Sequence, residues 1–326
     1  MVDRHMGNAS LKDDLIARCV RWLLGRVPLQ KYFGYWQESG FHVLPVNFYS
    51  PVPDTRELNA DRLRTASEMR GVALNEAAQL ELLQSFRERY AAEYDAFHND
   101  PTTDHSEYYH HNGFFESVDP ELLYCMIRHH QPSRIIEVGS GFSTRLAAQA
   151  IAVNGVHSSD YTCQYTVIDP FASSGISHLL SNSIRVLRNP VQSTDTSLFE
   201  LLNEGDILFI DSTHTVRIGG DVVFEVLEIL PRLNPGVLIH FHDIFLPRHY
   251  PPEIVLDRAP ERFWAEQYLL QAFLAFNPRF EIVFAAAWMH QQCGGSLGQA
   301  FRSYRERCKA EPTWIGPGSI WLRTVA

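Results

Sequence analysis

Two short segments of the sequence hold acids and imidazoles close together. The first is Asp211–His214, which follows an apolar run, and the second is His240–Asp243, which ends another. The carboxyl ends of parallel strands meet at one edge of a sheet, so we expect Asp211 and Asp243 to lie close together. Two carboxylates a few ångströms apart repel each other unless one is protonated or a cation bridges them. The pattern therefore predicts a reactive site built from both segments.

The residues leave two kinds of chemistry open at this site. Carboxylate oxygens suit Mg²⁺, Ca²⁺ or Mn²⁺, and an added imidazole shifts the preference towards Mn²⁺, Fe²⁺ or Zn²⁺. The candidate metal ligands are Asp211, His242 and Asp243. Without a metal, His214 or His242 is the candidate general base, because an imidazole titrates near neutral pH. With Asp243, these two histidines are the predicted catalytic residues, whereas His240 lies inside the apolar run and is expected to be structural.

A third segment, residues 134–150, predicts a strand, a glycine turn and a helix. The apolar run over 134–138 is followed by Gly139, Ser140 and Gly141, and Ser143 can cap a helix. Such a turn lets the backbone approach a ligand, and the N–H groups of the helix start favour a nucleotide-like molecule. We therefore expect a ligand at this end of the first strand.

Strands and helices alternate over the rest of the chain. Further strands are expected at 165–169, 184–187, 206–211, 237–242, 280–288 and 319–325. Helices are expected at 120–130, 196–202, 219–230 and 261–276, with a polar loop at 154–164 and an irregular or helical segment at 294–308. This alternation predicts an α/β fold with a doubly wound parallel sheet.

Asp169 is the candidate for binding ribose hydroxyls. It ends the second predicted strand and lies 32 positions after Glu137. The acid that binds ribose usually lies about 20 positions further along. The polar loop at 154–164 accounts for the extra residues.

The sequence before this sheet predicts a separate N-terminal region, residues 1–114, ahead of a domain at 115–326. Helices are expected at 11–24 and 74–94, and an extended connector with an edge strand at 41–54. Tyr108–Phe115 is rich in aromatic and imidazole groups and is expected either to contact substrate or to pack as a loop. With Phe245–Pro252, this loop is expected to line the pocket that binds the substrate.

The composition argues against several partners. A net charge of -10 and a pI near 5.8 disfavour nucleic acid and anionic membranes, because a phosphate backbone needs a basic surface. The five cysteines are scattered without metal-site spacing, which favours a reduced, cytoplasmic setting. The apolar helix at 11–24 is interrupted by charges and is therefore expected to be neither a signal peptide nor a membrane span.

The segment Glu137–Ser143, with the pattern E-x-G-x-G-x-S, resembles motif I of the class I S-adenosylmethionine-dependent methyltransferases. A dinucleotide fingerprint would need a third glycine where Thr144 stands. The resemblance implies a seven-stranded Rossmann-like sheet whose terminal strand is antiparallel, preceded by N-terminal helices. It also implies a set of cofactor contacts, with Gln192 near the adenine: Glu137, Gly139, Ser140, Gly141, Ser143, Asp169, Gln192 and Asp211.

The acids after strands four and five are also similar to those of metal-dependent O-methyltransferases. In that group the acids hold a divalent ion, here Mg²⁺ or Mn²⁺, that deprotonates the acceptor hydroxyl. The match is partial, because Ile244 stands where a second acid or amide is expected and His242 would have to substitute. The resemblance implies S-adenosylmethionine-dependent transfer of a methyl group to a hydroxyl or carboxylate oxygen of a small molecule.

Several further expectations follow from this interpretation. An aromatic pocket suits a flat acceptor of secondary metabolism, and a carboxylate acceptor would pair with Arg248. The N-terminal region is expected to form a lid or the surface of a homodimer. Two alternatives are an NAD-linked oxidoreductase on a similar sheet and a protein that binds S-adenosylmethionine without turnover.

Overall fold

The computed structural model describes residues 11–26, 29–172, 184–256 and 262–326. Its contacts divide the chain into two units, Met1–Leu58 and Asn59–Ala326. The predicted boundary between residues 114 and 115 remains a prediction. No helix in the described part of the chain has the length and apolar character needed to cross a membrane.

Unit 1 contains three short helical elements in its described residues. They are α1 (Leu11–Leu24), the 3-10 turn η1 (Leu29–Tyr32) and α2 (Phe33–Glu38). Large apolar side chains of α1, including Trp22 and Leu23, are exposed within this unit. The connector at 41–54 contains no strand, so the predicted edge strand there is wrong. Pro45, Pro51 and Pro53 cannot donate the ladder hydrogen bonds that a strand needs.

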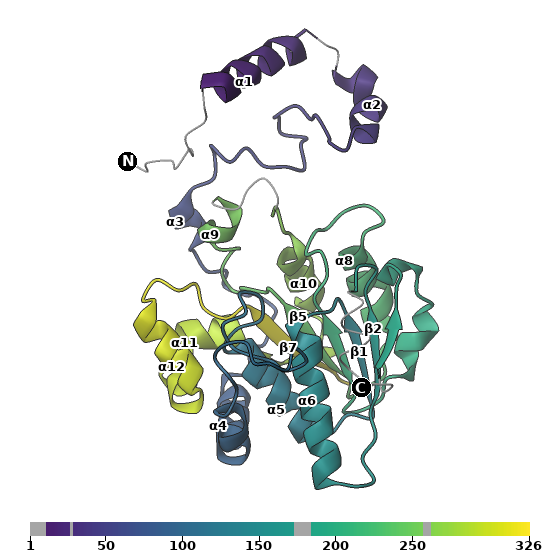
Figure 1. Ribbon diagram of the computed structural model, residues 1–326, viewed down its shortest axis with the longest axis vertical. Coiled ribbons are helices and arrows are strands. Elements are labelled where there is room, and N and C mark those ends of the chain that lie inside the picture. Colours follow the sequence, from purple (N-terminus) through teal and green to yellow (C-terminus); the bar gives the residue numbers. More distant parts are fainter. Residues whose placement is uncertain (1–10, 27–28, 173–183, 257–261) are drawn as a thin grey trace. The chain divides into compact units, whose positions relative to one another are not determined.

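Unit 2 is built on a seven-stranded sheet with the order β3-β2-β1-β4-β5-β7-β6 (Figure 1). The strands are β1 (Arg134–Val138), β2 (Gln164–Ile168), β3 (Ile184–Leu187), β4 (Ile207–Ile210), β5 (Leu238–His242), β6 (Phe280–Ala285) and β7 (Ser319–Thr324). The pairs among β1 to β5 are parallel, and β7 is antiparallel to both of its neighbours. The predicted doubly wound sheet with an antiparallel terminal strand is confirmed.

The helices of unit 2 pack as two groups. One group contains α4 (Glu76–Tyr94), α5 (Asp119–His130), α6 (Phe142–His157) and α11 (Ala286–Ala300). The other contains the 3-10 turns η3 (Val191–Ser193) and η4 (Thr196–Leu201), then α8 (Asp221–Phe224), η5 (Glu225–Ile229) and α10 (Glu266–Leu274). The first group also includes α12 (Arg302–Ala310), which packs on α11, and the second includes η6 (Leu230–Arg232), which contacts η4 and η5. The two remaining short helices are α3 (Ala60–Leu63) and α9 (Pro252–Val255). Strands β4 and β5 are buried along their whole length, as their apolar runs predict.

Two predicted helices take other forms. The helix expected at 196–202 is the 3-10 turn η4, begun by Asp195, whose carboxyl accepts the Ser197 N–H at 3.0 Å. The helix expected at 219–230 is divided into α8, a π-turn at η5 and a 3-10 turn at η6. The π-turn begins at Glu225, a buried acid whose carboxyl accepts from the hydroxyl of Ser212, just after β4, at 3.0 Å. Such π-turns are frequent near functional sites.

Other boundaries also differ from the sequence prediction. Helix α6 continues to His157, because buried Asn154 donates its side-chain amide to the Ile127 carbonyl at 3.0 Å and fixes this turn. The strand expected at 280–288 ends at Ala285, where α11 begins. The segment 294–308 is helical in α11 and α12, and the helix expected at 261–276 is α10, although residues 257–261 lie outside the described part.

Candidate active site

The glycine turn after β1 passes directly against the end of β4. Gly139 has φ +91°, and a Cβ there would lie 2.2 Å from the Asp211 carbonyl oxygen. Only glycine therefore fits at this position. A Cβ at Gly141 would meet no atom within 4 Å, so the turn borders open space on that side. The backbone at Gly141 is thus accessible to a ligand.

Glu137, the acid of the motif, is turned into the protein. Its carboxyl accepts from the Ser143 hydroxyl at 2.6 Å and from the Tyr165 hydroxyl. Burial raises the pKa of Glu137 to about 7, although both hydroxyls favour the charged form. Ser143 does not cap α6 as predicted: the N-cap is Gly141, and the Ser143 hydroxyl donates to Glu137 instead. Both residues brace the turn from within.

The other predicted cofactor residues lie along the same edge. Asp169 follows β2, accepts from the Ser140 hydroxyl, and also accepts the Phe171 N–H at 2.7 Å. Gln192 lies in η3, and its Oε1 is buried with no partner in the described residues. Buried polar atoms in proteins are nearly always hydrogen-bonded, so this oxygen is suited to accept from a ligand.

His214 lies between the two predicted acids. Its Nε2 is 3.3 Å from Asp211 Oδ1 and 3.6 Å from Asp243 Oδ2. Its Nδ1 lies 2.8 Å from Oε2 of Glu266, an acid that is 1% exposed. The structure therefore brings Asp211 and Asp243 together, as predicted, with an imidazole between them.

Several local contacts hold His214 in this place. Its carbonyl accepts the Ala265 and Glu266 N–H groups at 2.8 and 3.1 Å, so the start of α10 is fixed to the segment after β4. Thr213 donates its N–H and hydroxyl to the Asp221 carboxyl. His214 and Asp243 both have left-handed backbones, with φ +57° and +53°. Such conformations are uncommon outside glycine and often occur at functional positions.

The charges at this site stabilise one another. Burial disfavours a charged imidazole, but the Asp211 and Glu266 contacts outweigh it and hold the pKa of His214 well above its usual value. Burial would likewise raise the pKa of Asp211, but His242 and His214 lower it to about 2. We infer that His214 is an imidazolium at neutral pH and that Asp211 is ionised.

The two histidines of β5 differ from each other. His240 is fully buried and stacks on Phe209 at 4.1 Å, and burial holds its pKa well below the usual value. This supports its expected structural role. His242 is 6% exposed, and despite burial the charges of Asp211 and Asp243 raise its pKa. A third acid, Asp119, lies near it, but its carboxyl accepts the Gly318 N–H and the Ser319 hydroxyl and does not cap α5.

One pocket of 500 Å³ contains these groups, and we call it the acid pocket. Its acids are Glu116, Asp119, Asp211, Asp243 and Glu253. Its aromatic residues are Phe114, Phe245, Trp264 and Trp314. Arg262 lies over the Trp264 ring at 5.3 Å, and the same ring is 4.6 Å from His214. Its size suits a small molecule.

The Tyr108–Phe115 loop borders this pocket through its second half. Gly113 and Phe114 line the acid pocket, and Phe114 stacks near Phe142 at the start of α6. Tyr108 is buried and donates to the Phe115 carbonyl at 2.9 Å. The loop therefore packs at one end and borders the pocket at the other.

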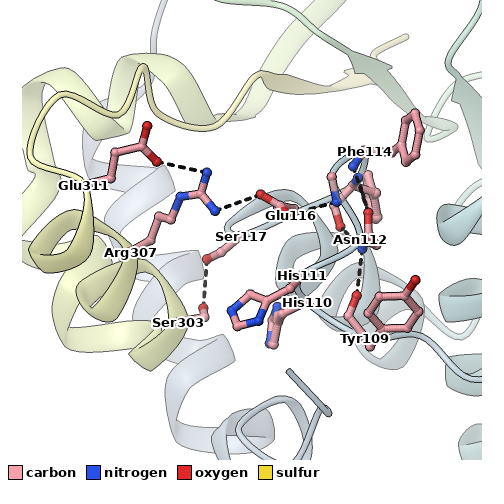
Figure 2. Close-up of polar contacts among 12 residues, drawn as sticks. Tyr109, His110, His111, Asn112, Phe114, Glu116, Ser117, Ser303, Arg307 and Glu311 are labelled. Carbon is pink, nitrogen blue, oxygen red and sulfur yellow. Dashed lines mark hydrogen bonds and ion pairs between the residues drawn. The ribbon is translucent and has the colours of Figure 1, made fainter. Parts of the chain in front are cut away.

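An ion-pair network joins this region to α12. Figure 2 shows Arg307 pointing between two acids, with Glu116 at 3.0 Å and Glu311 at 3.1 Å. The Ser117 and Ser303 hydroxyls lie 2.8 Å apart beside it. Glu116 thus reaches the acid pocket from a fixed position.

The predicted metal set is not supported. Among the described residues, no group of three or more histidine, cysteine or acidic side chains could hold a metal ion. The reason is visible at the centre of the site, where the His214 ring lies between Asp211 and Asp243 and places its own charge there. His242, which would complete the set, has a buried Nδ1 without a described partner.

Sequence reasoning missed Glu266 and Trp264. Both lie about 50 residues after His214 in the chain, and they reach it only because α10 begins beside the end of β4. No motif or spacing marks either residue. Arg248, the predicted carboxylate partner, lines a neighbouring pocket instead of the acid pocket.

Comparisons with known proteins identify the domain. Residues 136–244 match the family described as a methyltransferase domain. An uncharacterized protein from Archaeoglobus fulgidus is 34% identical over 181 residues, which is 52% of this chain and 78% of that protein. The chain belongs to this methyltransferase family. The protein is therefore an S-adenosylmethionine-dependent methyltransferase, and not the NAD-linked oxidoreductase considered as an alternative.

Two solved structures are similar to this methyltransferase at low identity. An O-methyltransferase from Bacillus cereus in complex with SAH is 13% identical, with 76% of this chain and 90% of that chain covered and a TM-score of 0.35. A TDP-rhamnose 3'-O-methyltransferase of calicheamicin biosynthesis is 14% identical, with 58% and 86% covered and a TM-score of 0.32.

Proposed function

We propose that this methyltransferase acts on an oxygen of a small molecule, with the acceptor bound in the acid pocket. The observation that carries the proposal is His214 placed between Asp211 and Asp243 at the same sheet edge as the glycine turn. The donor is expected along Gly139 to Gly141, with Asp169 near its ribose and Gln192 near its adenine. The open side of Gly141 and the unpartnered Oε1 of Gln192 support this placement.

The chemistry requires removal of one proton while the acceptor oxygen attacks the methyl carbon. S-adenosylmethionine supplies that methyl on a sulfonium sulfur, which keeps the electron pair of the broken C–S bond. We assign Asp243 as the acceptor of the hydroxyl proton, because it lies partly exposed in the acid pocket, whereas the pKa of Asp211 is lowered to about 2, which makes that acid a poor base. The oxygen becomes bonded to carbon, and the proton moves to the carboxylate.

His214 takes a role other than general base in this proposal. Its raised pKa keeps it protonated at neutral pH, so it has no free lone pair with which to accept a proton. An imidazolium between two acids supplies the positive charge that a divalent ion would supply, and it stabilises a developing oxyanion. Glu266 orients the ring through Nδ1. The charges of Asp211 and Asp243 also raise the pKa of His242, which favours a second positive charge in the site.

Two measurements test this proposal. Calorimetric titration with S-adenosylhomocysteine and with NAD should show binding of the first and none of the second. Methyl transfer from labelled S-adenosylmethionine to a panel of hydroxy and carboxy compounds should then proceed in chelator and fall at least a hundredfold in Asp243→Asn. Cofactor binding with no transfer to any acceptor would instead support the alternative of a protein without turnover.

A further inference from the structure

A second pocket adjoins the acid pocket on the side of α9. It has a volume of 270 Å³, and we call it the arginine pocket because it is lined by Arg64 and Arg248. Both pockets are lined by Phe245, Glu253, Trp314 and Ile315. A molecule held against these shared residues could reach into both.

The two pockets have opposite charge. The acid pocket has five acids against three basic side chains, Arg262, His214 and His242, so its acids are in excess. The arginine pocket has two arginines against one acid, Glu253. It also contains His249 and His290, and burial and the Arg248 charge lower the pKa of His290, so this ring is a neutral hydrogen-bonding group. An anion is therefore repelled from the first pocket and attracted to the second.

The arginines are available to a ligand in different degrees. Arg248 makes no ion pair in the described part of the chain, and its side chain is exposed. Arg64, just after α3, is 2.9 Å from Glu253 in α9, and Figure 1 shows these two helices side by side. This pair is about half exposed, so water competes with it and a bound anion could replace Glu253.

The histidines complete the polar wall. His290 Nδ1 lies 2.8 Å from the Tyr304 hydroxyl, and His249 Nδ1 lies 3.0 Å from the Tyr268 hydroxyl. In each ring Nε2 is the nitrogen left to bind a ligand. Phe245 and Trp314 provide an apolar bridge between this wall and the acid pocket.

We propose that the arginine pocket binds an anionic group, a carboxylate or a phosphate, on the acceptor, while the acceptor's hydroxyl lies in the acid pocket. This inference rests on the proposed function and narrows it. It assigns the hydroxyl as the methylated oxygen, because a carboxylate in the acid pocket would lie among acids of the same charge. The substrate class is therefore a small hydroxy compound that carries an anion across an apolar spacer.

Calorimetric titration of the full chain with inorganic phosphate and with acetate, at low ionic strength, tests the site directly. Arg248→Gln should weaken binding of the preferred anion about tenfold or more. Glu253→Gln should tighten it several-fold, because it frees Arg64. The anion that binds more tightly identifies the chemical class. A loss of packing alone would not produce opposite effects in these two variants.

Matched controls come from the exposed pair Glu228 and Arg232, which lines neither pocket. Arg232→Gln and Glu228→Gln should leave anion binding unchanged. Anion binding that is the same in Arg248→Gln, Glu253→Gln and the parent protein would overturn the arginine pocket as an anion site. Titration with S-adenosylhomocysteine in the same samples keeps the two proposals apart, because it reports on the methyl donor and not on this pocket.

Discussion

Two groups of acids lie at the same edge of the sheet, one buried and one partly exposed, and their charges are balanced in opposite ways. Near the end of β1, Glu137 has two hydroxyls as its described partners, and burial raises its pKa to about 7. After β4, the pKa of Asp211 falls to about 2 because burial is outweighed by His242 and His214. Glu137 is 1% exposed, and the described groups that shift its pKa most include no cation, whereas the Asp211 side chain is 37% exposed and lies beside His214. The two acids therefore differ in both exposure and neighbouring charge. The first group supports a turn, and the second keeps charges available for chemistry.

The largest expected effect comes from Gly139, where the two groups touch. Gly139→Ala would place a Cβ 2.2 Å from the Asp211 carbonyl oxygen at a left-handed backbone position. We expect the free energy of unfolding to fall by about 4 kcal/mol, measured by denaturant titration. Gly141→Ala is the matched control, because its Cβ would meet open space and should weaken S-adenosylhomocysteine binding while leaving stability nearly unchanged. Equal stability of the two variants would contradict the contact between the groups.

Removing the positive charge of His214 should leave the acids around it without a cation, as Glu137 is. His214→Gln leaves Asp211, Asp243 and Glu266 without the charge between them, and we expect a loss of about 3 kcal/mol in unfolding free energy. Because the pKa of His214 is raised in the folded protein, this deficit should be complete below pH 6.5 and shrink as pH rises through the folded pKa. Methyl transfer should fall at least a hundredfold. A deficit that grows with pH would exclude the proposed imidazolium.

Neutralising Glu137 should change the free energy of unfolding by less than His214→Gln does, and should increase it. Its pKa rises from 4.5 to about 7 on folding, so the unfolded chain loses a proton that the folded protein keeps, and stability falls as pH rises between these values. Glu137→Gln removes this dependence. We expect it to stabilise the protein at pH 8 by about 2 kcal/mol, because the raised pKa costs the parent protein about 3 kcal/mol there and the less favourable hydrogen bonds of the amide offset about 1 kcal/mol of the gain. Thermal unfolding of both proteins at pH 8 measures this, and destabilisation at that pH would contradict it.

The smallest expected effect is that of metal removal. His214 already supplies a positive charge between the acids, so dialysis against chelator should change methyl transfer less than twofold, and added Mg²⁺ or Mn²⁺ should not increase it. Transfer rates before and after dialysis check this. A rate that disappears in chelator and returns with Mg²⁺ would restore the metal hypothesis.

The fold was largely predictable because its signals are local. The apolar runs of β4 and β5, the turn at Gly139 and the alternation of strands and helices all follow from short stretches of sequence. Helix ends were less predictable. The extension of α6 to His157 depends on Asn154 reaching a carbonyl of α5, which no local pattern records.

The site was predictable only where the topology brings strand ends together. Asp211 and Asp243 could be paired because neighbouring parallel strands end at the same edge. Glu266 could not, since its approach depends on where α10 begins after a segment of irregular length. Without Glu266 no residue pattern predicts a protonated His214, and a metal ion between the two acids is an equally suitable interpretation.

The charge of His214 is the central claim, and nuclear magnetic resonance of ¹⁵N-histidine-labelled protein measures it directly. The His214 signals, assigned by their loss in His214→Gln, would be followed from pH 5 to pH 9. We predict imidazolium shifts for both ring nitrogens at neutral pH and a midpoint well above that of a free histidine, because Asp211 and Glu266 hold the proton. A His214 that titrates at or below pH 6.5 would contradict the proposed bridge between Asp211 and Asp243.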